Sequence, residues 1–215
     1  MDERVPIESA TVGGILDTLA SGSPAPGGGS ASALAGAAGA ALASMVANLT
    51  IGRERFRSSE AAMKKILERS ESARKEFVRL AEEDTKSFDR VLEAYRLPKT
   101  GQKEVEARKS AIEDALKGAC AVPLGTMCLA RDCLDLTLEV ARLGNPNALS
   151  DAAVSGLLLR AAVAGAGYNV LINLAGVADE GFKRETLGTH HRVVREAEDI
   201  WSRIESEVER GVAAR

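Results

Sequence analysis

The sequence predicts an all-α fold, a single-domain helical bundle with an Ala/Gly-rich central helix and long amphipathic helices. Apolar residues recur every three or four positions through most of the chain, which is the period of a helix. No segment shows the strict alternation of a strand. Because only 3% of the residues are aromatic, the core must use small aliphatic side chains and closely packed helices. The length of 215 residues suits one domain over residues 1–215.

Six helices are expected from this pattern. They are residues 7–20, 31–51, 59–96, 105–143, 152–178 and 183–210. The first helix has Val12, Ile15 and Leu19 on one face. The second carries no charge and is apolar on all sides, as expected for the central helix of a bundle. Its residues Gly36 and Gly39 lie on a face of small side chains that a neighbouring helix can approach closely.

The later helices differ from this central one. The third keeps the helical period for about ten turns without a breaker. The fourth is expected to bend or restart near Pro123, because proline has no backbone N–H to donate. Gly144 and Pro146 end it, and Ser150 and Asp151 open the largely apolar fifth helix. The sixth is charged and amphipathic.

Composition and charge exclude several classes of protein. The net charge is −3 and basic residues are interleaved with acidic ones, so no nucleic-acid partner is expected. Three cysteines without two-residue spacing indicate neither a zinc knuckle nor a disulfide framework. The first eight residues lack an apolar core, so we expect no signal peptide and a cytoplasmic location. The central helix could span a membrane by length, but its alanines, glycines and polar residues favour a bundle, so no membrane partner is expected.

The turn before the central helix is the most informative feature of the chain. It reads Pro24-Ala25-Pro26-Gly27-Gly28-Gly29-Ser30. The prolines fix φ, the glycines let the backbone fold tightly with accessible amides, and Ser30 is the expected N-cap. Free amides and the positive end of the helix dipole together favour an anion. The alternative is a tight loop that only allows this helix to pack closely.

Asp84 breaks the pattern of the third helix. It lies four residues after Leu80 and four before Phe88, so its carboxylate should face the bundle interior. A buried carboxylate must be paired, protonated or placed in a ligand cavity. Two interpretations follow, a substrate cavity or a buried ion pair with an arginine of another helix. The neighbouring Glu82 and Glu83 are expected to be solvated.

Polar residues also follow one face of the fifth helix. Asp151, Ser155, Asn169 and Asn173 are joined by small residues at three- or four-residue steps. The asparagine amides either read the flat edge of a heterocyclic ligand or hydrogen-bond to another helix. Asp151 is either part of such a site or a first-turn acid that favours the helix dipole.

Two further groups of charged residues give weaker signals. Arg53, Arg55 and Arg57 follow the central helix, where they either neutralise carboxylates of a ligand or are plain surface charge. His190 and His191 are the only imidazoles and have no carboxylate or cysteine pattern around them. We therefore expect a solvated loop there and no metal site.

Taken together, these stretches resemble the formiminotransferase-cyclodeaminase family, in particular its cyclodeaminase domain and stand-alone bacterial relatives, some of which are methenyltetrahydrofolate cyclohydrolases. The turn, the central helix and the sequence Met45-Val46-Ala47-Asn48-Leu49-Thr50-Ile51-Gly52 carry the resemblance first. It continues in the expected order through residues 84–88, 97–99, 122–124, 144–151 and 169–173. Together these stretches cover roughly residues 16–179.

The resemblance implies an all-α enzyme that acts on a tetrahydrofolate derivative and is usually a homodimer. We expect no tightly bound cofactor and no metal. It implies Asp84 and Asp151 as the acid and base, without choosing between them. It also implies residues that orient the pterin and the one-carbon bridge or meet the glutamyl carboxylates. These are Pro26, Gly27, Gly28, Gly29, Ser30, Arg53, Arg55, Asn145, Asn147, Ser150, Asn169 and Asn173.

The reaction expected first is that of a formimidoyltetrahydrofolate cyclodeaminase, which converts 5-formimidoyltetrahydrofolate to 5,10-methenyltetrahydrofolate and ammonia. The alternative is a methenyltetrahydrofolate cyclohydrolase, which interconverts 5,10-methenyl- and 10-formyltetrahydrofolate. A non-catalytic helical module that binds folate or oligomerises is an alternative from another class. A membrane-associated helical protein is the weakest alternative.

Overall fold

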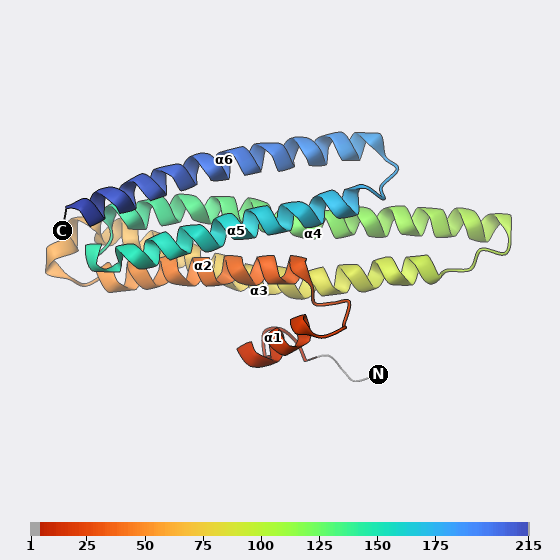
Figure 1. Ribbon diagram of the computed structural model, residues 1–215, viewed down its shortest axis with the longest axis horizontal. Coiled ribbons are helices and arrows are strands. Elements are labelled where there is room, and N and C mark those ends of the chain that lie inside the picture. Colours follow the sequence, from red (N-terminus) through yellow and green to blue (C-terminus); the bar gives the residue numbers. More distant parts are fainter. Residues whose placement is uncertain (1–4, 215) are drawn as a thin grey trace.

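A computed structural model describes residues 5–214, and within them the protein is all-α, as predicted. The elements are α1 (Val12–Ala20), α2 (Gly28–Thr50), the 3₁₀ helix η1 (Glu54–Ser59), α3 (Glu60–Arg96), α4 (Gln102–Leu143), the 3₁₀ helix η2 (Pro146–Ala148), α5 (Leu149–Leu174) and α6 (Glu180–Ala213). The five long helices lie lengthwise in one bundle, and α1 lies to one side of it (Figure 1). The prediction of one domain includes residues 1–4 and 215, which lie outside the described residues.

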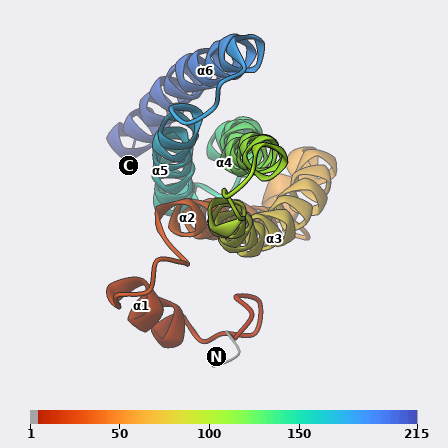
Figure 2. The same ribbon diagram turned by 90° about the vertical axis from the view of Figure 1, so that its right-hand side faces the viewer.

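The bundle is organised around α2 and α4. Helix α2 packs between α3 and α5, while α4 contacts α2, α3, α5 and α6. In the end-on view, α4 and α5 form a layer between α6 on one side and α2 and α3 on the other, and α1 lies beyond α2 (Figure 2). The main core gathers apolar side chains from α2 to α6, among them Phe77, Met127 and Leu159.

The small-residue face of α2 is buried, as predicted. A Cβ at Gly36 would come within 2.6 Å of the Phe77 ring, and one at Gly39 within 2.7 Å of Leu159. These two glycines therefore let α3 and α5 approach the backbone of α2. The bulkier side chains, such as Met45, lie on the opposite and more exposed side of the helix.

Two predicted helix starts were wrong. The first helix begins at Val12, because residues 5–11 instead form an irregular stretch held to α3 by a hydrogen bond from the Ile7 N–H to Glu82 Oε2 (3.1 Å). Ser30 is not the N-cap of α2. Gly27 is the N-cap, so α2 begins inside the glycine run and Ser30 is fully buried in its first turn.

Of the predicted bend or restart near Pro123, the restart was wrong, because α4 is continuous from Gln102 to Leu143. Proline leaves the carbonyl four residues earlier, that of Ala119, without its helical N–H partner. Asn173 of α5 supplies a substitute, since its Nδ2 donates to the Ala119 oxygen at 2.7 Å. The neighbouring helix thus satisfies the carbonyl that the proline exposes.

Two segments, Gly28–Thr50 and Pro146–Leu174, are long and apolar enough to cross a membrane by length and composition. In the bundle they lie side by side, with 56% and 39% of the relevant windows buried. Apolar side chains remain on the outer sides of both helices, and we call this area the α2/α5 face. Its exposed side chains are Ala38, Met45, Val154, Leu157, Ala161, Ala164, Tyr168 and Ile172, and its half-buried ones are Ala35 and Leu42.

Candidate functional site

The first turn of α2 lies between a carboxylate of α3 and an amide of α5. Gly28 and Gly29 open the helix, so backbone N–H groups without helical partners gather at this point. Asp84 lies against Gly29 and Asn169 lies against Gly28. The structure thus brings together predicted site residues from three separate parts of the sequence at the positive end of α2.

Asp84 is half-buried and is held by hydrogen bonds from Ser30 instead of by a cation. The Ser30 hydroxyl lies 3.0 Å from Asp84 Oδ2 and 2.9 Å from the carbonyl of Ala81, so both oxygens compete for its single proton. The backbone N–H of Ser30, in the first turn of α2, also favours the charged form of the carboxylate. No ion pair to Asp84 is present among residues 5–214, so the predicted alternative of a buried pair with an arginine was wrong.

Burial raises the pKa of Asp84, and the hydrogen bonds from the side chain and backbone of Ser30 oppose this rise only in part. A carboxyl group with a raised pKa exchanges its proton more readily near neutral pH than an ordinary aspartate does. Its position beside free amides also places a proton-exchanging group where an anionic or hydrogen-bonding part of a ligand can bind.

Glycine at position 29 is required by the closeness of this carboxylate. A Cβ at Gly29 would overlap the carboxyl group of Asp84. At Gly28 the nearest atom to a Cβ would be Nδ2 of Asn169, at 3.6 Å, which is ordinary van der Waals contact. Of these two glycines, only Gly29 is therefore required by the close approach of a side chain from another helix.

The side-chain amide of Asn169 lies next to Gly28 of α2. Its Nδ2 donates to the carbonyl of Gly165 in its own helix at 2.9 Å, which fixes the orientation of the amide group. Asn173 has a different task, because its Nδ2 is used by the Ala119 carbonyl. The sequence predicted both asparagines on one face of the helix. In the structure, Asn169 is a candidate ligand contact, whereas Asn173 joins two helices.

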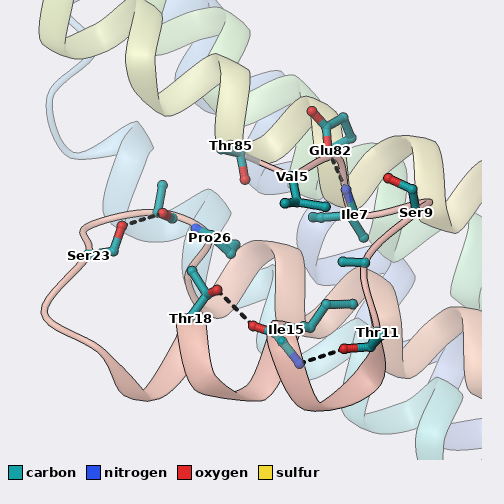
Figure 3. A pocket seen from close by; sticks show the side chains of 13 residues that line it. Val5, Ile7, Ser9, Thr11, Ile15, Thr18, Ser23, Pro26, Glu82 and Thr85 are labelled. Atoms are coloured by element: carbon teal, nitrogen blue, oxygen red, sulfur yellow. Dashed lines mark hydrogen bonds between the residues drawn. The ribbon is translucent and has the colours of Figure 1, made fainter. Parts of the chain in front are cut away.

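A pocket of about 470 Å³ adjoins this cluster. Figure 3 shows it between the N-terminal segment, residues 5–27, and helix α3. Pro26 and Thr85 belong to its wall, and the Thr85 hydroxyl lies 3.3 Å from that of Ser30. Asp84 does not line the pocket but is joined to it through these two hydroxyl groups.

Sequence reasoning missed this pocket and misplaced Glu82. We expected Glu82 to be solvated, but it is half-buried, lines the pocket and accepts the backbone N–H of Ile7. The contact of the N-terminal segment with Glu82 leaves only a weak signal in the sequence. In the described part of the chain before Ala25, Ile7 is the only buried apolar residue. A contact across 75 residues cannot be read from helical periodicity.

The other predicted site residues lie toward the opposite end of α2. Ser155 Oγ donates to the carbonyl of Gly39 at 2.8 Å, whereas Asn169 lies beside Gly28, so α5 runs antiparallel to α2. Asp151 comes one turn before Ser155. It is therefore separated from the Gly29 level by about 14 residues of α2, or roughly 21 Å. Within one chain, the structure does not bring Asp151 to Asp84.

Asn145 has a structural role near the C-terminal end of α2. Its Nδ2 donates to the Leu49 carbonyl (3.2 Å), its N–H to Thr50 Oγ1 (2.8 Å), and its Oδ1 accepts the N–H of Asn147 (3.0 Å). These bonds cap η2 and tie it to the end of α2. The remaining predicted residues here are exposed: Arg53, Arg55, Asn147 and Ser150.

The imidazoles were wrongly predicted to lie in a solvated loop. Both belong to α6, and Nδ1 of His190 is buried without a hydrogen-bond partner among the described residues. Burial lowers the pKa of His190, with a smaller contribution from the neighbouring His191. In residues 5–214 no group of three or more His, Cys, Asp or Glu side chains could hold a metal ion, and the three cysteines are free.

Comparison with known proteins gives a consistent result. The family model described as formiminotransferase-cyclodeaminase matches residues 11–191. A methenyltetrahydrofolate cyclohydrolase from Methylorubrum extorquens is 42% identical over 202 residues, which cover 92% of this chain and 97% of that protein. The mouse formimidoyltransferase-cyclodeaminase is 37% identical over 84% of this chain, which spans 33% of that longer protein.

The fold agrees with these matches. The crystal structure of formiminotetrahydrofolate cyclodeaminase from Thermotoga maritima superposes with a TM-score of 0.87 at 30% sequence identity. The similarity covers 96% of this chain and 99% of that one. The resemblance drawn from the turn, Asp84 and the asparagine segments is therefore confirmed, and the chain belongs to the formiminotransferase-cyclodeaminase family.

Proposed function

We propose that this protein is a folate one-carbon enzyme that opens or closes the bridge between N5 and N10 of tetrahydrofolate. Methenyltetrahydrofolate cyclohydrolase is the activity we place first. The observation that carries it is the 42% identity to a cyclohydrolase over nearly the full length of both chains. The site supports this reaction class because it combines a proton-exchanging carboxyl group, a buried hydroxyl and free amides.

In the proposed hydrolysis, water attacks the cationic methenyl carbon and Asp84 accepts a proton from that water. The C–N5 bond of the tetrahedral intermediate then breaks, N5 takes a proton, and the remaining O–H loses its proton to give the 10-formyl product. One proton is released for each turnover. The negative charge of Asp84 also favours the cationic substrate and is held in place by Ser30.

Cyclodeamination is the second candidate, and the Thermotoga maritima structure favours it because it matches nearly the whole chain. Here N10 attacks the formimino carbon on N5, the amino group of the intermediate takes a proton, and ammonia leaves. The same carboxyl group serves as proton donor in this direction. The two activities differ in the nucleophile and the leaving group, but both pass through a tetrahedral carbon between N5 and N10.

One pair of assays tests the proposal and separates the two activities. The purified protein is incubated with 5,10-methenyltetrahydrofolate and, separately, with 5-formimidoyltetrahydrofolate, and the methenyl absorbance is followed. We expect loss of absorbance in the first assay. A gain only in the second assay makes the protein a cyclodeaminase, and no enzymatic change in either supports the non-catalytic folate-binding module and overturns the proposal.

We also propose the setting in which this enzyme works. Neither reaction changes an oxidation state, so the proposed chemistry needs no redox cofactor. We propose that the enzyme holds no tightly bound cofactor and no metal. We propose a cytoplasmic homodimer whose partners are the folate substrate and a second copy of the chain, without nucleic acid or membrane. The apolar α2/α5 face supports the dimer, because exposed side chains such as Tyr168 (69%) and Ile172 (73%) are costly in water.

A further inference from the structure

A carboxylate lies in the wall of the pocket beside Asp84. The pocket has a volume of about 470 Å³ and lies between α3 and the N-terminal segment, residues 5–27 (Figure 3). Apolar side chains such as Ile7 and Ile15 form much of its lining, and Glu82 is the only charged residue among the described residues that line it. Small-molecule ligands bind in mostly apolar pockets of this size that hold a few polar groups in fixed positions.

Glu82 can still accept hydrogen bonds from a ligand. A carboxylate offers about four acceptor sites on its two oxygens. One of them is used by the Ile7 N–H, which donates to Oε2 at 3.1 Å, and the ammonium of the exposed Lys86 side chain lies 3.8 Å from Oε1. Within residues 5–214 no further hydrogen bond or ion pair to this carboxylate is present. The Glu82 side chain is 32% exposed, so its free acceptor sites are partly withdrawn from bulk water.

Glu82 lies about one helical turn from Thr85, the residue that links the pocket to Asp84. The Thr85 hydroxyl points from α3 into the pocket (Figure 3) and lies 3.3 Å from the Ser30 hydroxyl, which is 3.0 Å from Asp84 Oδ2. Residues three apart share a face of a helix, and these two levels are about 4.5 Å apart along its axis. In a tetrahydropterin the 2-amino group lies about 5 Å from N5, which is close to one helical turn. A ring held at its 2-amino edge by Glu82 therefore brings N5 to the level of Thr85.

Resting on the folate activity proposed above, we propose that this pocket binds the 2-amino-4-oxopyrimidine ring of the substrate and that Glu82 recognises it. The ring carries two adjacent donors, its 2-amino group and N3–H, and the two oxygens of a carboxylate can accept such a pair side by side. The one-carbon bridge next to N5 then lies at the Thr85 end of the pocket, beside the Ser30–Asp84 hydrogen bond. Glu82 binds and orients the substrate, while Asp84 exchanges its protons.

A cycle that changes both the protein and its ligand tests this inference. Wild type and Glu82→Gln are each assayed with 5,10-methenyltetrahydrofolate and with its 2-desamino-2-methyl analogue, which lacks the 2-amino donors. The amide of Glu82→Gln keeps one oxygen for the Ile7 N–H but presents an NH2 group to the ring. We expect KM for the normal substrate to rise about 10- to 100-fold, as for a lost hydrogen bond to a charged group, with a much smaller change in kcat. For the analogue, KM of the wild type should already be high, and Glu82→Gln should raise it little further.

Glu83→Gln is the matched control, because it removes the same charge from the next position of α3. Its carboxylate pairs with Arg90 at 2.6 Å and does not line the pocket. This exposed pair should matter little, so KM should stay within about two-fold of the wild-type value. An equal rise of KM in both variants would show a general effect of charge and overturn the inference. An unchanged KM of Glu82→Gln, or effects of the two changes that simply multiply, would overturn it as well.

A second variant separates recognition of the ring from attachment of the N-terminal segment. Ile7→Ala weakens the packing of this segment on α3 but leaves the carboxylate of Glu82 in place. We expect it to raise KM for both ligands by a similar factor, so that the preference for the 2-amino group remains. If Ile7→Ala instead abolishes that preference, Glu82 acts only by holding the segment, and the inference is wrong.

Calorimetric titration with 6-methyltetrahydropterin tests the pocket independently of turnover, because this probe has the ring but no one-carbon bridge and no glutamyl tail. It should bind the wild type and bind Glu82→Gln at least about 10-fold more weakly. If the wild type converts neither folate but binds the probe in this way, the proposed function fails and the assignment of the pocket stands. If the wild type turns over folate but Glu82→Gln binds substrate and probe normally, the function stands and the assignment fails. Absence of both turnover and probe binding would overturn both.

Discussion

Among single residues, Asp84 combines a cost in fold stability with a pKa that suits proton transfer. Burial raises its pKa, so the charged form costs the folded state more than the unfolded state. Because the folded protein holds this proton more tightly, the stability of the fold decreases as the pH rises from the unfolded pKa, near 3.8, through the raised folded pKa. An uncharged amide of the same shape avoids this cost.

We therefore predict that Asp84→Asn raises Tm at about pH 7 and leaves it nearly unchanged at about pH 3, where the carboxyl group is protonated in both states. Turnover of the folate substrate should fall by about 10²- to 10⁴-fold, the usual contribution of a general acid or base. Thermal denaturation at both pH values and initial rates check this. An Asp84→Asn protein with lower Tm at neutral pH would show that the charge stabilises the fold instead.

Gly29 leaves space for the same carboxylate because it has no side chain. We predict that Gly29→Ala displaces Asp84 and lowers kcat by about 100-fold, since small misplacements of a catalytic group have effects of this size. Gly188→Ala on α6 is the matched control, because a Cβ there meets open space. It should leave kcat unchanged and stabilise its helix by about 0.5–1 kcal/mol. Equal losses of kcat in both variants would refute the steric explanation.

At the scale of elements, the continuity of α4 depends on α5. Pro123 frees the Ala119 carbonyl, and Asn173 satisfies it at 2.7 Å. We predict that Asn173→Leu lowers the free energy of unfolding by about 1–3 kcal/mol, the cost of an unsatisfied buried group. In a Pro123→Ala background the new N–H can bond to Ala119, so the same change should cost much less. Urea denaturation of the four proteins in this cycle measures the coupling. Equal costs in both backgrounds would contradict this pairing.

The N-terminal segment is a second case in which an element depends on a distant one. No residue of α1 is buried, and Val12 and Leu16 are 76% and 58% exposed. A helix of nine residues is marginal in water on its own. Ile7 and its hydrogen bond to Glu82 therefore carry much of the attachment of this segment to the bundle and shape the pocket beside Asp84.

At the scale of the whole molecule, the α2/α5 face links folding to assembly. We predict that Tm of the wild-type protein rises with protein concentration, because the dimer binds only folded chains. Ala161→Glu places a charge in the proposed interface and should give a monomer whose Tm no longer depends on concentration. Calorimetry at several concentrations with light scattering measures both properties. A concentration-independent Tm for the wild type would argue against a dimer in equilibrium with monomers.

The fold class, the order of the helices, the small-residue face of α2 and the inward position of Asp84 could all be predicted from the sequence. These features depend on local periodicity, on residue size and on short motifs that resemble those of the family. Sequence reasoning failed at Ser30, and it allowed a restart at Pro123 that does not occur, because in both cases a partner from another helix changes what the local rule predicts. It also failed at His190, where helix and burial replace the expected loop.

Which of the predicted site residues lie close together depends on how the helices pack and could not be predicted from the sequence. The antiparallel packing of α5 on α2 brings Asn169 to Gly28 and carries Asp151 about 21 Å away from Asp84. Helical spacing fixes which residues share a face of one helix, but it contains no information about the level at which two helices pack. For α5 on α2, that level is set by the fit of Leu159 at Gly39, and it divides the predicted site between the two ends of one apolar face.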